Sequence, residues 1–222
     1  TRLDNKTAST IMVPASATTE ITLPDSTHVW LNAGSMLRYG RDFNIRNRDI
    51  RLEGEAYFEV AHNKTLPFVV HTEDCNVTAL GTKFNVYSYP GSTATHATLL
   101  EGSVMVENSM SGIILAPGQK ATVSDNAIIR SDVDASQYIS WINGEIRYDE
   151  ISLDELFNRL SLLFMADIRH DGLSCGDRMI RAAFSREESL ESIMQAITCL
   201  LPLNCEALQG AFAITEIHKD NI

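Results

Sequence analysis

Residues 20–129 alternate between short β-branched or aromatic runs and turn residues, with a turn at intervals of about ten residues. The clearest run is Ile50–Val60, where small or apolar side chains occupy every second position and three glutamates and a tyrosine lie between them. A period of two is typical of a strand that is buried on one face. No amphipathic helix interrupts the segment, so the sequence predicts an all-β domain, folded as a β-sandwich, a barrel or a short twisted β-solenoid.

The pattern changes after about Ser136, where the spacing of apolar residues becomes helical. Two amphipathic helices are predicted, and every apolar position of the first recurs 37 residues later in the second. We expect a capping box at the start of each helix, formed by Ser152 with Glu155 and by Ser185 with Glu188. The apolar positions are Leu153, Leu156, Phe157, Leu160, Leu163 and Phe164 in the first helix, and Leu190, Ile193, Met194, Ile197, Leu200 and Leu201 in the second.

Strand-like segments flank both predicted helices, and each helix must bury its apolar stripe against a sheet. The sequence therefore predicts a small α/β domain of two β-α-β units, with both helices on one side of one sheet. Its predicted strands are residues 146–148, 167–169, 179–184, 203–206 and 212–217. The predicted organisation is a polar tether at 1–13, an all-β domain at 14–135 and the α/β domain at 136–222.

The chain carries a net charge of −11, which argues against binding to duplex DNA or to anionic lipid headgroups. One local basic group exists, but Asp42 and Asp49 lie within it, so we expect a solvated face of mixed charge. The arginines of this group are Arg38, Arg41, Arg46, Arg48 and Arg51.

The start of the chain is polar and lacks both Met and the apolar core of a signal peptide. No apolar run approaches the roughly eighteen residues that a membrane-spanning helix needs. We therefore expect the chain to be a piece of a longer protein.

None of the four cysteines belongs to a C-x-x-C pair, which argues against a zinc ribbon or a thioredoxin-like motif. Cys75 is distant in sequence from the other three. A disulfide between two of Cys175, Cys199 and Cys205 is one interpretation, and four free buried thiols are the other.

The sequence contains no strong catalytic signal. The histidines are dispersed, and no nucleophile elbow, Walker A loop or dinucleotide fingerprint occurs. Glu53, Glu55 and Glu59 share one face of a predicted strand at steps of about 7 Å, a separation that a glycosidase could use. A carboxylate ladder on a solvated strand is far commoner, so we expect no enzyme, no metal and no cofactor. Trp30 lies within a predicted strand, and we expect it in the core.

Several segments between residues 20 and 125 together resemble the FecR domain, in the order of that family. The most specific are G-E-A-Y-F-E-V at 54–60 and L-G-T-K-F-N-V at 80–86. The others are residues 23–35, 48–53, 67–70, 99–104 and 115–119. Ser26 departs from the family, which usually has Gly in this L-P-D-G turn; a positive φ there would make Ser26 unfavourable.

Residues from Trp141 onward resemble the small domain that follows FecR domains in Bacteroidetes proteins, and that domain is similar to the secretin and TonB short N-terminal fold. The resemblance implies a periplasmic, signal-receiving region of a single-pass inner-membrane anti-sigma regulator. Such a regulator relays ligand occupancy of an outer-membrane TonB-dependent transducer to an extracytoplasmic-function sigma factor, which is held by a cytoplasmic segment outside this chain. Glycan or iron uptake genes are the implied target.

A small sheet with an open edge can accept a strand from a partner. We expect the transducer's N-terminal signalling domain to bind the predicted strand 179–184 and the start of the second helix. The candidate contact residues are Met179, Ile180, Arg181, Phe184, Arg186 and Glu187. The alternatives are a periplasmic carbohydrate-binding module, in which Trp30, Trp141 or Tyr148 stacks on a sugar ring, and a scaffold module.

Overall fold

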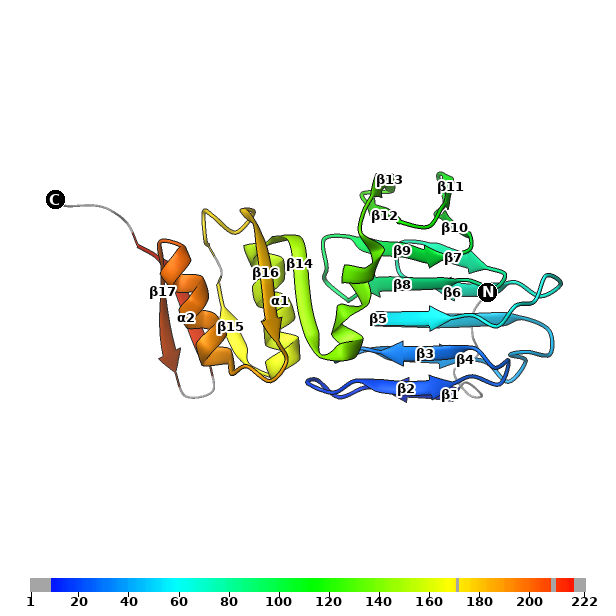
Figure 1. Cartoon of the computed structure of the whole chain (residues 1–222), viewed down its shortest axis with the longest axis horizontal. Helices are drawn as coiled ribbons and strands as arrows, with labels where there is room; N and C mark the ends of the chain where they lie inside the picture. Colours follow the sequence, from blue (N-terminus) through cyan, green and yellow to red (C-terminus); the bar gives the residue numbers. More distant parts are fainter. Residues whose placement is uncertain (1–8, 171, 209–210, 218–222) are drawn as a thin grey trace. The chain divides into compact units, whose positions relative to one another are not determined.

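The computed structural model describes residues 9–170, 172–208 and 211–217, which divide into two units, Thr1–Ile142 and Asn143–Ile222 (Figure 1). The boundary lies at Ile142, somewhat later than the predicted 135, because a 3₁₀ helix, η1 (Ala135–Asn143), belongs almost entirely to the first unit. Within the described residues, no helix has the length and apolar character that crossing a membrane requires.

The N-terminal unit is all-β, as predicted, and its described strands form one thirteen-stranded sheet. The strands are β1 (Ser9–Met12), β2 (Thr19–Thr22), β3 (His28–Leu31), β4 (Met36–Tyr39), β5 (Arg48–Glu59), β6 (Phe68–His71), β7 (Asn76–Ala79), β8 (Lys83–Ser88), β9 (Thr95–Glu101), β10 (Val104–Glu107), β11 (Gly112–Leu115), β12 (Gln119–Ser124) and β13 (Ala127–Asp132).

Strand β5 joins the two halves of this sheet. Its first half pairs with β4 and β6, and its second half, from Gly54 onward, pairs with β3 and β8. After β5 the chain adds antiparallel hairpins to the two halves in turn: β6–β7 and β10–β11 extend one half, and β8–β9 and β12–β13 extend the other. Figure 1 shows β5 in the middle of the strand array.

A single hydrophobic core lies between the two halves. The inward positions of β5 alternate as the sequence predicts, with Ile50, Leu52, Ala56 and Phe58 all buried. Phe58 packs against Phe68 and Phe84, with ring centroids 5.8 and 5.1 Å apart. At about 25 cal/mol per Å² of buried apolar area, these aromatic rings are major contributors to the stability of the unit.

Two expectations for this unit are wrong. Ser9–Met12 pairs with β4 and Val13 is buried, so the strand array begins inside the segment predicted to be a tether; residues 1–8 of that segment lie outside the described residues. Trp30 is half-buried on the outer face rather than in the core. Its neighbours Val29 and Leu31 face the core, and the two-residue period of a strand directs Trp30 to the opposite side.

The turn before β3 does contain the positive φ that the FecR resemblance implies. Ser26 has φ 69°, and its amide N–H donates to the Leu23 carbonyl oxygen at 2.9 Å. A residue with a Cβ is strained in this region, while glycine is not.

We therefore expect Ser26→Gly to stabilise the N-terminal unit by about 0.5–1 kcal/mol, since relief of strain exceeds the added entropy of the unfolded chain. Urea unfolding followed by tryptophan fluorescence measures this unit, because both tryptophans, Trp30 and Trp141, lie in it. Ser26→Ala is the matched control and should give no gain. Equal midpoints for Ser26→Gly and the wild type would contradict the strain argument.

The C-terminal unit contains both predicted helices and all five predicted strands. Its elements are β14 (Glu145–Ser152), α1 (Leu153–Phe164), β15 (Asp167–Arg169), β16 (Met179–Ser185), α2 (Leu190–Leu200), β17 (Leu203–Leu208) and β18 (Ala211–Glu216). They form two small sheets instead of the single predicted sheet: β14 pairs with β16, and β18 lies between β15 and β17. Each helix therefore connects a strand of the first sheet to a strand of the second, and both helices share one core with both sheets.

The helix caps follow the sequence with one correction. Ser152 caps α1 and accepts from the Glu155 amide at 3.2 Å, as predicted. The second helix begins later than expected, because Ser185 ends β16 and the cap is Ser189, which accepts from the Ser192 amide. Ser189 is 37 residues after Ser152, so the internal offset includes the caps. Leu200, predicted on the buried face, is 84% exposed at the last position of the helix.

Candidate functional site

Arg48 comes first by size among the fully buried side chains of the described residues, so it is the one member of the basic group that departs from the expected solvated face. Its Nη1 lies 3.0 Å from Asp25 Oδ2, and the two side chains are 1% and 2% exposed. The guanidinium also donates to the carbonyl oxygens of Ala61, Asn63 and Leu66. Arg48 shares its strand face with Ile50 and Leu52, so the period of β5 directs it inward. The ion pair ties the start of β5 to the turn before β3, and the hydrogen bonds to carbonyl oxygens tie it to the segment after β5.

Glu55 is also buried, although it belongs to the predicted carboxylate ladder. Its two carboxylate oxygens accept hydrogen bonds at 2.9 Å, one from Asn32 Nδ2 and one from Asn85 Nδ2. Its backbone N–H donates to Ser35 Oγ at 2.9 Å, and Ser35 Oγ lies 3.0 Å from its carbonyl oxygen. Glu55 therefore connects β5 to β8 and to the end of β3.

The other two glutamates of the ladder have different neighbours. Glu59 accepts from the Tyr57 hydroxyl at 3.0 Å and lies 3.4 Å from Lys83 Nζ. Glu53 lies 3.7 Å from Arg51 Nε. The structure thus gives each carboxylate its own partners in the sheet, and the three do not converge on a cavity as a glycosidase pair would.

Gly54 explains why the most specific sequence string begins with glycine. Its φ is +118°, and a Cβ placed there would lie 2.4 Å from Ser35 Oγ and 2.6 Å from Ser35 Cα. The residue sits where β5 passes from one half of the sheet to the other. The strings at 54–60 and 80–86 lie on paired strands, with Ala56 opposite Val86 and Phe58 opposite Phe84.

Comparison with known proteins identifies this arrangement. The FecR protein family matches residues 9–105, which include the Arg48, Gly54 and Glu55 contacts. The chain is FecR-like. Two crystal structures of a candidate anti-sigma factor from Parabacteroides distasonis ATCC 8503 superpose on it with a TM-score of 0.87 and 26% sequence identity, covering 94% of this chain and 99% of theirs. No curated protein matches the sequence.

The likeness to these two structures extends beyond the FecR domain, because a match over 94% of the chain must include most of the C-terminal unit. The sequence resemblance to the FecR domain itself covered residues 20–125, and the FecR family match covers 9–105. The FecR domain therefore begins at β1, inside the segment interpreted from sequence as a tether.

The surface predicted to bind a partner lies on β16, which pairs only with β14 among the described strands. Met179 is 56% exposed and Arg181 is also exposed, so both are accessible on the outer face of the sheet. Ile180 and Phe184 face the other side and pack against the core of the unit.

Arg186 and Glu187 lie in the turn between β16 and α2, rather than at the start of the helix. The Arg186 amide donates to the Gly144 carbonyl oxygen at 2.9 Å and extends the antiparallel pairing of β14 and β16 at its end. Glu187 is exposed, and its amide donates to Ser185 Oγ. The structure thus brings Met179, Arg181 and Glu187 to the accessible surface and places Arg186 at its end.

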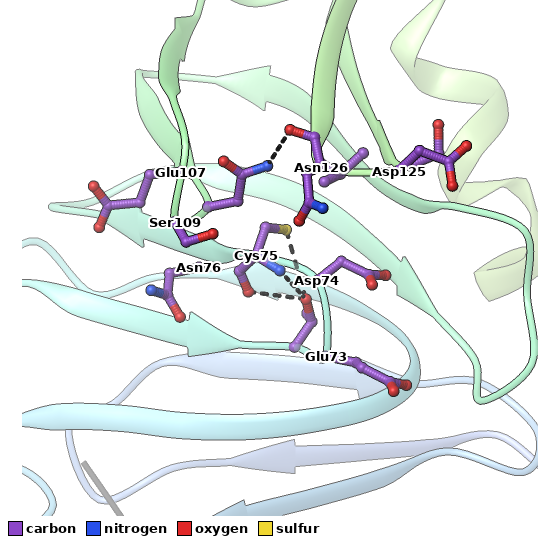
Figure 2. A pocket seen from close by; sticks show the side chains of 12 residues that line it. Glu73, Asp74, Cys75, Asn76, Glu107, Ser109, Asp125 and Asn126 are labelled. Atoms are coloured by element: carbon purple, nitrogen blue, oxygen red, sulfur yellow. Dashed lines mark hydrogen bonds between the residues drawn. The ribbon is translucent and has the colours of Figure 1, made fainter.

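A polar pocket of about 320 Å³ lies in the FecR domain, where three hairpin turns meet (Figure 2). The turns are β6–β7, β10–β11 and β12–β13. The lining residues are Thr72, Glu73, Asp74, Cys75, Asn76, Glu107, Asn108, Ser109, Val123, Ser124, Asp125 and Asn126. Sequence reasoning missed this pocket, because nothing local in the three turns indicates that they converge. Among the described residues, no group of three or more His, Cys, Asp or Glu is arranged to hold a metal ion.

All four cysteines are free thiols, and they differ in exposure. Cys199 is exposed on α2, Cys175 and Cys205 are half-buried, and Cys75 is buried in the lining of the pocket. Burial raises the pKa of Cys75 from 9.0 to about 11, an effect that a hydrogen bond with Thr72 partly opposes. Burial also raises the pKa of Cys175 and of Cys205.

We expect alkylation at neutral pH to modify Cys199 first and Cys75 last. A pKa near 11 lowers the thiolate fraction of Cys75 about a hundredfold, and burial slows access further. Peptide mass spectrometry at timed intervals measures the four rates, and the denatured chain is the control, in which they should become similar. Modification of Cys75 as fast as Cys199 in the folded protein would be inconsistent with this structure.

Proposed function

We propose that this chain is the signal-receiving region of an anti-sigma regulator. The observation that supports this most is the similarity, over almost the whole chain, to the candidate anti-sigma factor of P. distasonis, together with the FecR match at residues 9–105. In this proposal the region lies in the periplasm and belongs to a regulator anchored in the inner membrane. It relays ligand occupancy of an outer-membrane TonB-dependent transducer to an extracytoplasmic-function sigma factor, controlling glycan or iron uptake genes.

We place the transducer contact on the open edge of β16. Among the strands that the structure describes, this seven-residue strand has one hydrogen-bonded neighbour, so its other edge can offer main-chain N–H and C=O groups to a partner strand. Main-chain pairing along such an edge supplies affinity, while Met179 and Arg181 on the exposed face supply specificity. In this role the FecR domain is a rigid support, and its Arg48 and Glu55 contacts maintain its shape.

Proline substitutions at two adjacent positions of β16 test whether its open edge binds the transducer. Ala182 and Ala183 lie opposite Tyr148 and Arg147 in regular register, and successive residues of a strand direct their N–H groups to opposite sides. Of Ala182→Pro and Ala183→Pro, one removes a hydrogen bond to β14 and lowers thermal stability. The other removes only an N–H on the open edge.

We expect the second, stably folded variant to bind the transducer's N-terminal signalling domain at least tenfold more weakly than the wild type, measured by isothermal titration calorimetry. Ala207→Pro on β17, an edge strand of the other sheet, is the control and should bind normally. If the Ala207 variant alone loses binding, the contact lies on the other sheet. If no form binds a folded signalling domain, the proposed transducer partner is wrong.

A carbohydrate-binding role is the second candidate, because Trp30 is half-exposed on the outer face of the FecR domain. Its ring centroid lies 5.4 Å from Tyr57 and 6.2 Å from His28. Aromatic faces of this kind can stack on sugar rings. Calorimetry with oligosaccharides, using Trp30→Ala as the comparison, distinguishes this role from a scaffold function. Saturable binding that the substitution abolishes would support carbohydrate binding. The absence of any heat of binding would favour the scaffold function.

A further inference from the structure

Strand β13 forms an open edge of the large sheet in the N-terminal unit. Among the described strands it pairs only with β12, at the end of the strand order (Figure 1). All its residues except Ile128 are exposed, and Ile129 is 61% exposed although its side chain is apolar. An open edge of this kind can offer main-chain N–H and C=O groups to another strand.

One hydrogen bond just beyond β13 shows which of its main-chain groups face the open edge. The Val133 N–H donates at 2.8 Å to the carbonyl oxygen of Gly118, which directly precedes β12. Successive residues of a strand direct their main-chain groups to opposite sides, so Ile128, Arg130 and Asp132 point away from β12. An antiparallel partner strand must therefore place its own edge-facing residues opposite these three.

A second copy of β13 can meet this edge in registers centred on residue 129, 130 or 131. Centring on 130 puts Arg130 opposite Arg130 of the second copy, and like charges in direct opposition destabilise a sheet. Centring on 129 uses the start of the strand, where Asn108 Nδ2 donates to the Asn126 carbonyl oxygen at 2.9 Å and holds the β10–β11 turn alongside. The register centred on 131 avoids both problems.

In the register centred on 131, the segment 129–133 is complementary to itself. Arg130 lies opposite Asp132 of the second copy, and the two-fold symmetry repeats this pair of opposite charges. On the other face of the strand, Ile129 lies opposite Val133, and Ser131 lies opposite Ser131. The order apolar, basic, small, acidic, apolar therefore forms matched pairs when the same strand is reversed.

The side chains that form these pairs are accessible. Arg130 is exposed, and within the described residues no carboxylate lies within 4.0 Å of it. Asp132 is also exposed; its Oδ1 accepts from Gln119 Nε2 at 3.0 Å, and a guanidinium can approach Oδ2. Pairing removes part of the exposed Ile129 side chain from water, which favours association.

We propose that this chain forms a two-fold symmetric dimer, in which β13 pairs antiparallel with β13 of a second copy in the register centred on Ser131. The sheets of the two N-terminal units then continue across the dimer, and two Arg130–Asp132 ion pairs fix the register. This contact lies in the N-terminal unit and does not depend on the proposed transducer contact at β16.

Sedimentation equilibrium of the full chain, from about 5 to 500 µM at about 0.15 M salt, tests the dimer. We expect the apparent mass to rise with concentration from 24.6 kDa toward twice that value. Arg130→Asp brings carboxylates opposite one another, and Asp132→Arg does the same with guanidiniums, so each variant alone should dimerise at least tenfold more weakly. An equimolar mixture of the two variants should dimerise again, because an acidic strand then meets a basic one.

Arg46→Asp is the matched control, since it makes the same change in net charge at an arginine outside β13 that is 78% exposed. It should dimerise as the wild type does, and urea unfolding midpoints show that each variant is folded. A wild type that stays at 24.6 kDa over the whole range overturns the proposal. So do single variants that dimerise as strongly as the wild type, and folded variants whose mixture stays monomeric.

Discussion

Replacing Arg48 by Leu should lower the free energy of unfolding of the FecR domain by about 3–5 kcal/mol. The substitution leaves Asp25, which is 2% exposed, as an uncompensated buried charge. It also removes the donor from three carbonyl oxygens, those of Ala61, Asn63 and Leu66. A buried group that loses its partner retains the full cost of its desolvation, so the loss is much larger than the net value of the ion pair.

Arg46→Leu is the matched control for this prediction. Arg46 belongs to the same basic group of the sequence and lies 3.9 Å from Asp42, but the two side chains are 78% and 59% exposed. Its replacement should change stability by less than about 0.5 kcal/mol. Urea unfolding followed by tryptophan fluorescence measures both variants, and Arg48→Met with Asp25→Asn should recover part of the loss because it removes both charges. A loss below 1 kcal/mol for Arg48→Leu would show that the guanidinium is not buried as described.

Gly54→Ala should destabilise the same domain by about 3 kcal/mol or more. The added Cβ would lie 2.6 Å from the Ser35 backbone Cα, so relief of the clash requires movement of the main chain between β3 and β4. The φ of +118° adds strain for any residue with a Cβ. Because Ser35 Oγ bonds the Glu55 main chain, this movement would also weaken the Glu55 contacts.

Gly91→Ala separates the two contributions. Gly91 also has a positive φ, +80°, but nothing lies within 4 Å of a Cβ placed there. The free energy of unfolding of this control should fall by only about 1 kcal/mol, which is the cost of holding a residue with a Cβ at a positive φ. The same urea unfolding measurement is made on both variants. If Gly54→Ala does not fold, its yield of soluble protein is compared with that of Gly91→Ala instead. Equal losses for the two variants would rule out the predicted clash at Ser35.

Much of the local structure follows from sequence periodicity. The two-residue alternation of Ile50–Val60 predicted β5, and the 3.6-residue spacing of apolar side chains predicted α1 and α2. The offset of 37 residues between the helices also holds for the true caps, Ser152 and Ser189. These features are local, so neighbouring residues carry enough information to specify them.

Contacts within the candidate sites depend on partners distant in the sequence. In the sequence, Arg48 belongs to a group of arginines that are expected to be exposed. Its burial depends on Asp25, which lies in the turn before β3 and forms an ion pair with it. Glu55 stood in a ladder of three glutamates, and only Asn32 and Asn85, on other segments, single it out. The sequence predicted one sheet in the C-terminal unit, and the structure has two, because the spacing of strands along the chain does not determine which strands pair.

The sequence by itself therefore determined the element types, the likeness to FecR and the two-part organisation, because hydrophobic period, turn residues and motif strings are properties of neighbouring positions. The tertiary structure alone decided which charges are buried, which edge of β16 is open and which three turns enclose the pocket. These outcomes depend on strand pairing between segments tens of residues apart, and a side chain's solvation is set by what the fold packs against it.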